Sequence, residues 1–137
     1  NYSYIDATFD DTDDAGNPQA LAGNRFRLTP ENSASLGFDA SFELASGKTL
    51  YFRPSYTWRS QVYFEDDNSQ GIEQDAYGLL NLTAGLRGDH WDFQLWAQNL
   101  TDEEYLIDAG NTGAVFGIPT YVPGNPRLYG VTATFRF

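Results

Sequence analysis

The sequence predicts an all-β fold, an antiparallel up-and-down meander of about six strands. Apolar and polar residues alternate with a period of two through most of the chain, as they do in strands with two different faces. No stretch shows the 3.6-residue period of an amphipathic helix. Short and long connections alternate along the chain, which places tight turns at one end of the sheet and longer loops at the other.

Each strand follows from its own alternation. The last one is the clearest, because every odd position from Tyr129 to Phe137 is apolar or aromatic and the even positions are Gly, Thr, Thr and Arg. The opening segment is expected to be a strand whose faces are ambiguous. In order, the expected strands cover residues 2–9, 35–44, 50–59, 80–87, 91–98 and 129–137.

The connections between these strands fall into two classes. Residues 45–48 and 88–90 hold the Gly and Asp that tight hairpin turns need. The other three connections cover roughly residues 10–30, 64–76 and 102–126. They are polar, rich in glycine and without a strand pattern, so we expect mobile, protease-sensitive loops there.

The polar faces of the strands favour an outer-membrane barrel over a soluble sandwich. They carry charges of both signs, which could pair across neighbouring strands inside a lumen: Arg53, Arg59, Arg87, Arg136, Asp39, Glu43 and Asp92. Aromatic residues stand near the ends of the apolar faces, as in an interfacial girdle. Short turns and long loops match periplasmic turns and extracellular loops.

Composition narrows the function classes. The formal net charge of −11 argues against a nucleic-acid partner, which needs a basic surface. The absence of cysteine excludes disulfides and thiol chemistry, and no apolar run is long enough for a transmembrane helix. The chain begins at Asn1 without Met or a signal peptide, so we expect it to be processed or cut from a longer protein.

Two motifs near the C-terminus carry a family resemblance. The segment NLTDEEY spans residues 99–105, and PGNPR spans residues 123–127 ahead of a final strand that ends on Phe137. Upstream, LAGNR at residues 21–25 is followed by Pro30. In this order and spacing they resemble the C-terminal end of a TonB-dependent outer-membrane receptor, and the resemblance covers nearly the whole chain.

The resemblance implies a transport protein of the bacterial outer membrane. That family has a barrel of about 22 strands closed by an N-terminal plug. With energy from TonB it imports iron–siderophores, cobalamin, haem or glycans. This chain shows no plug, no TonB box and only about six strands. We therefore interpret residues 1–137 as a C-terminal barrel segment that meets TonB and the plug only through missing N-terminal parts, and we expect no cofactor.

The resemblance also implies two sets of functional residues. The terminal strand resembles the signal read by the barrel-assembly machinery, carried by Tyr129, Val131, Phe135 and Phe137. Many acids fall in the long loops, where an acidic rim would attract cationic or metal-bearing ligands or divalent ions that bridge lipopolysaccharide. Together with aromatic side chains, the expected extracellular ligand residues are Tyr63, Asp66, Asp67, Tyr77, Tyr105, Phe116 and Tyr121.

Two further features suggest chemistry but fail on detail. Asp11 and Asp13 fit an EF-hand loop ahead of Gly16, yet Ala15 and Ala22 stand where that loop needs oxygen ligands, so we predict a solvated loop and no metal. His90 beside Asp89 suggests a serine hydrolase using Ser46, but no G-x-S-x-G elbow exists. The prediction is therefore that the chain is not an enzyme.

One alternative remains open from the sequence. A free-standing β protein derived from such a segment would have two unpaired sheet edges and would self-associate through them. It would act as a binding module or as a serine-type hydrolase. Solubility without detergent separates this alternative from the membrane barrel.

Overall fold

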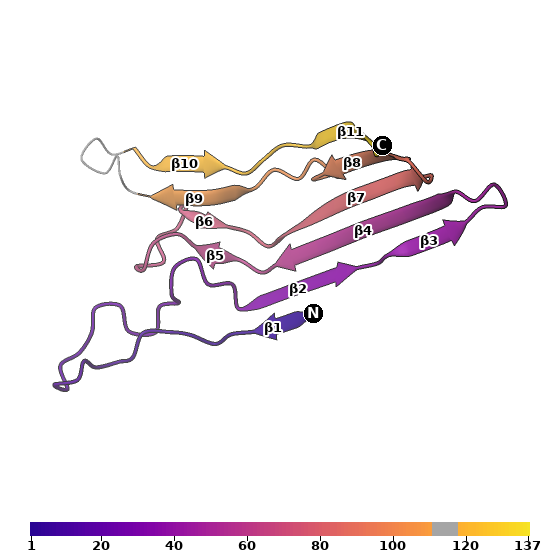
Figure 1. Ribbon diagram of the computed structural model, residues 1–137. Helices are drawn as coiled ribbons and strands as arrows, with labels where there is room; N and C mark the ends of the chain where they lie inside the picture. Colours follow the sequence, from indigo (N-terminus) through magenta and orange to yellow (C-terminus); the bar gives the residue numbers. More distant parts are fainter. Residues whose placement is uncertain (111–117) are drawn as a thin grey trace.

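The computed structural model describes residues 1–110 and 118–137, and this part of the chain is all-β, as predicted. Within it, no helix has the length and apolar character needed to span a membrane. Figure 1 shows a broad antiparallel sheet with its tight turns at one end and its long connections at the other. In spatial order, its strands are β1 (Tyr2–Tyr4), β2 (Asn32–Gly37), β4 (Thr49–Arg59), β7 (Tyr77–Arg87), β8 (Trp91–Gln98) and β11 (Leu128–Phe135), with β3 (Ala40–Glu43) also beside β4.

The strand predicted over residues 35–44 is divided into β2 and β3, and Pro54 explains the break. Both strands keep one register on β4, since Gly37 pairs with Ser55 and Ala40 with Phe52. Phe38 therefore lies opposite Pro54, and its N–H donates to the Pro54 carbonyl at 3.1 Å. Pro54 has no N–H to return the second bond of that pair, so the ladder is interrupted without a shift in register.

The opening strand is shorter than predicted, because β1 ends at Tyr4 and not at residue 9. Beyond β1, the chain stays close to the residues that lead into β2. Ile5 N–H donates to Glu31 O at 2.8 Å, and Phe9 N–H donates to Asn24 O at 2.9 Å. The pairing is irregular there, so this connection folds back on itself without a continuous ladder.

The connections over residues 64–76 and 102–126 were expected to be loops without a strand pattern, and the structure corrects this. Each connection carries a hairpin, one formed by β5 (Val62–Tyr63) and β6 (Glu73–Gln74), the other by β9 (Leu106–Gly110) and β10 (Thr120–Pro123). These strands are too short to show a period in the sequence. They are stabilised by a small buried cluster that joins the two hairpins, made of Phe64, Ile72 and Ala109 with Val62 and Leu106 packed against it.

The two faces of the main sheet differ as predicted. The even positions of β2, β3 and β4 and the odd positions of β8 and β11 form an apolar face. It is open to the surroundings: Leu36, Leu95 and Val131 are 75%, 61% and 70% exposed. The opposite face carries the charges. Directly opposed residues form ion pairs there, Arg53 with Asp39 and Arg87 with Asp92, each with 2.8 Å between guanidinium Nε and carboxylate oxygen.

Large aromatic rings lie flat over glycines of neighbouring strands on this polar face. Tyr51 lies over Gly85, and Trp96 lies over Gly130, each directly across the ladder. A Cβ at Gly85 would stand 2.3 Å from the Tyr51 ring, so only glycine leaves room for it. Tyr51 is consequently almost fully buried although it belongs to a single open sheet.

Candidate functional site

The two C-terminal motifs meet where β8 ends and β11 begins, and Asn99 joins them. Its side chain is buried and makes three hydrogen bonds. The Asn99 amide donates to Glu103 O at 2.9 Å and to Asn125 O at 3.1 Å, and Asn99 Oδ1 accepts from Glu103 N–H at 2.9 Å. Asn99 has φ +48°, a left-handed conformation that asparagine tolerates better than most residues. One residue therefore both turns the chain and bonds the facing motif.

Asp102 makes the second link between the motifs. Its carboxylate accepts from the backbone N–H of Arg127 at 3.0 Å, and the Arg127 guanidinium lies 3.5 Å from the other carboxylate oxygen. Asp102 also has a positive φ, +58°. The two left-handed residues bring the acidic turn back against the chain that enters β11.

Tyr105 makes the third link. Gly124 N–H donates to Tyr105 O at 2.7 Å, and Gly124 lies against the Tyr105 ring so closely that a Cβ there would be 2.1 Å from it. Tyr77, at the start of β7, stacks on the same ring with 4.8 Å between centroids. The aromatic pair thus connects the rim to the central strands of the sheet.

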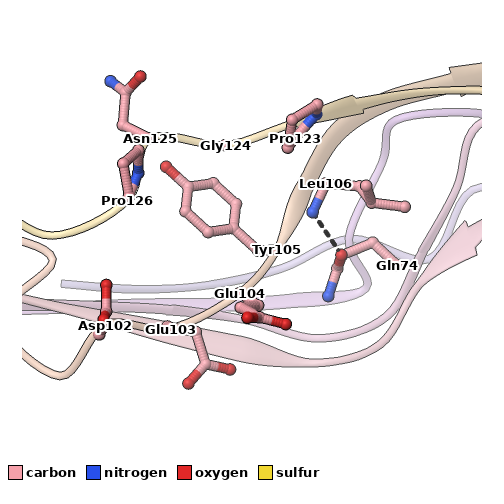
Figure 2. Close-up of a pocket in the computed structure, with 10 residues that line it drawn as sticks. All are labelled: Gln74, Asp102, Glu103, Glu104, Tyr105, Leu106, Pro123, Gly124, Asn125 and Pro126. Atoms are coloured by element: carbon pink, nitrogen blue, oxygen red, sulfur yellow. Dashed lines mark hydrogen bonds between the residues drawn. The ribbon is translucent and has the colours of Figure 1, made fainter.

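These links enclose a pocket of about 700 Å³, shown in Figure 2. Gln74 reaches it from β6, where its Oε1 accepts from Leu106 N–H at 2.6 Å. Three carboxylates line it, and within the described part of the chain only that of Asp102 is paired with a cation, so the pocket is acidic. The lining residues are Gln74, Asp102, Glu103, Glu104, Tyr105, Leu106, Pro123, Gly124, Asn125 and Pro126.

A second, smaller groove of about 210 Å³ lies on the polar face at the same end of the sheet. Tyr105 lines both the acidic pocket and this groove. The groove holds one cation, Arg59. Its lining residues are Thr57, Arg59, Tyr77, Leu79, Tyr105 and Ile107.

Near the tight turns, the polar face carries a cluster around Tyr51. The Tyr51 hydroxyl donates to Asp92 Oδ1 at 2.8 Å. The guanidinium carbons of Arg53 and Arg87 lie 5.0 and 5.3 Å from the Tyr51 ring centroid, within cation–π range. Both arginines pair with carboxylates through Nε, so two of the charge pairs predicted for a lumen wall form across strands.

The long connections bind one another at the opposite end. Asn68 of the β5–β6 hairpin exchanges two hydrogen bonds with the backbone of Arg25, at 2.8 and 2.9 Å. Leu28 N–H donates to Tyr63 O at 2.8 Å, and the Tyr121 hydroxyl donates to Gly71 O at 3.0 Å. These contacts tie the β1–β2, β5–β6 and β9–β10 connections into one cap.

The family model for "TonB dependent receptor-like, beta-barrel" matches residues 1–100. The chain belongs to this family. It is a family of receptors for transport, and the antiparallel sheet with its exposed apolar face is the wall of such a receptor barrel. The resemblance that the C-terminal motifs suggested is thereby confirmed.

Solved structures of similar fold are receptor barrels too. One is FyuA, the ferric yersiniabactin uptake receptor from Yersinia pestis, with a TM-score of 0.75 and 20% identity over 85% of this chain. Another is BauA, the ferric preacinetobactin receptor from Acinetobacter baumannii, with a TM-score of 0.73 and 21% identity over 98% of this chain. The matched region covers 18% of each of those chains, so this chain spans about a fifth of their length.

The residues expected to bind ligand are only partly brought together in the receptor barrel. Tyr77 and Tyr105 stack, whereas Tyr63 and Tyr121 lie on separate hairpins. Asp66 accepts a long hydrogen bond from Arg27 N–H through its carboxylate, and Asp67 accepts from Ser69 N–H. Phe116 lies outside the described residues. Ligand binding by this set stays a prediction.

Three side-chain amides hold parts of the site together, and the sequence did not predict this role for them. The side-chain amides of Gln74, Asn81 and Asn99 bond to the backbone of Leu106, Asn99 and Glu103, in that order. The long-range partner of Asn99 at Asn125 depends on the register of β8 and β11, which the sequence alone does not give. The sequence placed Arg59 on the polar face, but it did not predict that Tyr77 and Tyr105 lie beside Arg59.

Asp11 and Asp13 lie near the tip of the β1–β2 connection. Asp13 Oδ1 accepts from Ala15 N–H at 2.9 Å and from Asn17 N–H at 2.8 Å. The Asn17 side-chain amide and these backbone groups lower the pKa of Asp13 below its ordinary 3.8. Among residues 1–110 and 118–137, no three His, Asp or Glu side chains gather to hold a metal ion.

His90 stands in the β7–β8 turn. Its backbone carbonyl accepts from Arg136 N–H at 2.8 Å. No hydrogen bond in the described part of the chain joins its imidazole to Ser46 or to Asp89. The geometry therefore gives the hydrolase alternative no support.

The four residues expected to form the assembly signal stand at the sheet edge formed by β11. Tyr129, Val131 and Phe135 share the apolar face, and all three are exposed. Phe137 follows the end of β11 and is also exposed. Recognition of these residues by an assembly machinery stays a prediction.

Proposed function

We propose that this chain forms the C-terminal wall of a TonB-dependent receptor in the bacterial outer membrane. In the full-length receptor, a plug and TonB act with this wall in the uptake of a siderophore, vitamin or glycan. The observation that carries the proposal is the contrast between the two faces of one sheet. Leucine, valine and phenylalanine are exposed on one face, while arginine–aspartate pairs cross the other.

The apolar face is suited to lipid. A water-exposed face of this size is unfavourable, because burial of apolar surface contributes roughly 25 cal/mol per Å². In a bilayer, lipid hydrocarbon covers this face, so the cost is removed without a second sheet packed against it. In the same orientation the ion pairs face a lumen, where a plug or water surrounds them.

The two ends of the sheet fit the two sides of that membrane. The tight β3–β4 and β7–β8 turns suit the periplasmic side, and the cap of long connections suits the outside. The acidic pocket of residues 102–104 then lies at the outer rim, where it favours cationic or metal-bearing ligands and divalent ions that bridge lipopolysaccharide. The barrel-assembly machinery would read the terminal strand from the periplasmic side.

A pair of matched substitutions in the full-length receptor tests the membrane orientation. Leu95→Arg places a charge on the apolar face and should destabilise the folded barrel by about 2–4 kcal/mol if it lies near the bilayer midplane. Gln94→Arg places the same charge on the polar face and should cost far less. Folded fractions after refolding into lipid vesicles measure the difference. Equal effects of the two variants would contradict the orientation.

Transport itself needs a second measurement. Cells that produce the receptor should take up its ligand only when TonB is present, and the receptor should sediment with outer membranes. A candidate panel consists of ferric siderophores, cobalamin and oligosaccharides. Equal uptake with and without TonB would refute the transport mechanism.

A further inference from the structure

We propose that the groove around Arg59 is a subsite for an anionic ligand group attached to a flat ring. The inference rests on the proposed function, because it places the groove on the lumen wall near the outer rim. It narrows the ligand from a broad set of nutrients to those with a carboxylate, or a similar anion, next to an aromatic system.

The position of Arg59 follows from the register of the sheet. Arg59 stands directly between Ser33 of β2 and Tyr77 of β7, on the same polar face as the Tyr51 cluster. It is the last residue of β4, at the end that carries the long connections, and its side chain is exposed. A ligand that enters from outside reaches this part of the wall first.

Among the residues that the structure describes, no ion pair balances the charge of Arg59. On the polar face, Arg53 pairs with Asp39 and Arg87 pairs with Asp92. Within residues 1–110 and 118–137, no carboxylate lies within ion-pair distance of Arg59. An unpaired guanidinium on the wall of a chain with net charge −11 is a selective place for an anion.

The aromatic part of the groove is rigid. Tyr105 is fixed by Gly124 and by its carbonyl bond to the Gly124 N–H, and Tyr77 stacks on it with an interplanar angle of 18°. Leu79 and Ile107 supply apolar walls. Stacked rings and apolar walls favour a flat, apolar ligand part.

The size of the groove fits one ring system with its charged group. Its volume is about 210 Å³. A cavity of roughly 150 Å³ is enough to hold benzene. One benzene ring with its carboxylate therefore fills this groove, with the carboxylate toward Arg59 and the ring along the tyrosines, and a second fused ring extends from the open side of the groove.

The test uses the purified full-length receptor in detergent and three probes of the same shape. The probes are 2-naphthoate, neutral 2-naphthylmethanol and cationic 2-naphthylmethylammonium, measured by titration calorimetry or saturation-transfer NMR. We expect naphthoate to bind best and the cation worst. Arg59→Gln should weaken naphthoate binding about tenfold or more, the size of a lost charged hydrogen bond, and leave the neutral probe unchanged.

Further variants separate the roles of charge and ring. Arg59→Lys should retain part of the naphthoate affinity, whereas Tyr77→Leu should weaken the anionic and neutral probes alike. Arg27→Gln is the matched control: it removes an exposed arginine whose side chain makes no ion pair in the described structure, and it should change nothing. Heat-modifiable migration on gels confirms that each variant is folded.

Two results would overturn the subsite. One is naphthoate affinity that is unchanged in Arg59→Gln, and the other is equal binding of all three probes to the unmodified receptor. Either result, together with outer-membrane location and TonB-dependent uptake, would refute the subsite alone. A receptor that is absent from the outer membrane would instead refute the proposed function.

Discussion

Replacing Asn99 by alanine should open the rim of the sheet, which is the contact between residues 99–105 and 123–127 where β8 passes into β9. The substitution removes an amide that makes three hydrogen bonds with backbone groups of residues 103 and 125. It also leaves alanine in a left-handed conformation at φ +48°. Both effects act on one buried residue, and neither depends on the ligand.

The magnitude can be worked out from these contacts. A hydrogen bond contributes about 1 kcal/mol net, so three bonds amount to roughly 3 kcal/mol. The left-handed backbone adds about 1 kcal/mol for alanine and little for glycine. We therefore expect local destabilisation of about 4 kcal/mol for Asn99→Ala and about 3 kcal/mol for Asn99→Gly.

Hydrogen exchange in the full-length receptor measures this opening. At a tenfold change per 1.4 kcal/mol, the amide of Glu103 should exchange on the order of 100-fold faster in Asn99→Gly and several-fold faster again in Asn99→Ala. Peptides that cover residues 99–106 and 123–128 should both respond, because Asn99 bonds to each segment.

Asn125→Ala is the matched control. Asn125 lies at the same rim, but only its backbone carbonyl takes part in the contact, and its side chain is exposed. Its exchange should match that of the unmodified receptor. If all three variants exchange alike, Asn99 does not hold the rim, and the reasoning from its hydrogen bonds is wrong.

Two further predictions concern the sheet and the outer loops. Gly85→Ala should cost about 1–3 kcal/mol of unfolding free energy by overpacking, because its Cβ would stand 2.3 Å from the Tyr51 ring. Gly37→Ala is the control, because a Cβ there would have nothing within 4 Å. Equal denaturant midpoints of the two variants would contradict the prediction. Because the pKa of Asp13 is lowered in the folded chain, its ionised carboxylate stabilises the turn fully above pH 3.8. That stabilisation is lost as the pH falls through the lowered pKa. Carbon-13 titration of labelled aspartates should show the Asp13 pKa rising toward 3.8 in Asn17→Ala, and an unshifted pKa would exclude the Asn17 side-chain bonds as its cause.

The faces of the long strands were predictable because each face repeats every second residue. A strand such as β8 needs no information from elsewhere to assign Leu95 and Gln94 to opposite sides. Pairing of individual charges was less predictable. Arg53 meets Asp39 only because β3 and β4 share a register, and the sequence alone does not give that register.

The cap of hairpins was missed for a different reason. A strand of two residues, such as β5 or β6, is too short for a periodic pattern. Its stability comes from Phe64 and Ile72 packing against Ala109, which belongs to a connection more than thirty residues away. The candidate subsite likewise brings together residues that are far apart in the sequence, since its lining includes Arg59, Tyr77 and Tyr105 from three separate segments.

The polar segment NLTDEEY between two strands now has a physical explanation. The backbone ladder between β8 and β11 ends at the pair Gln98–Leu128, and the ladder between β9 and β10 begins at Leu106–Pro123. Side chains cover the gap: Asn99 bonds to Asn125 O and Asp102 to Arg127 N–H.

Hydrogen bonding therefore continues from one ladder to the other, although the chain turns twice through left-handed residues between them. Such a joint lets the wall change direction and keeps its backbone groups bonded. It also fixes the Tyr105 ring, because Gly124 N–H bonds to Tyr105 O just before the second ladder starts. Loosening Asn99 should therefore disturb the aromatic side of the groove as well as the rim. This couples the structural role of the motif to the ligand site proposed beside it.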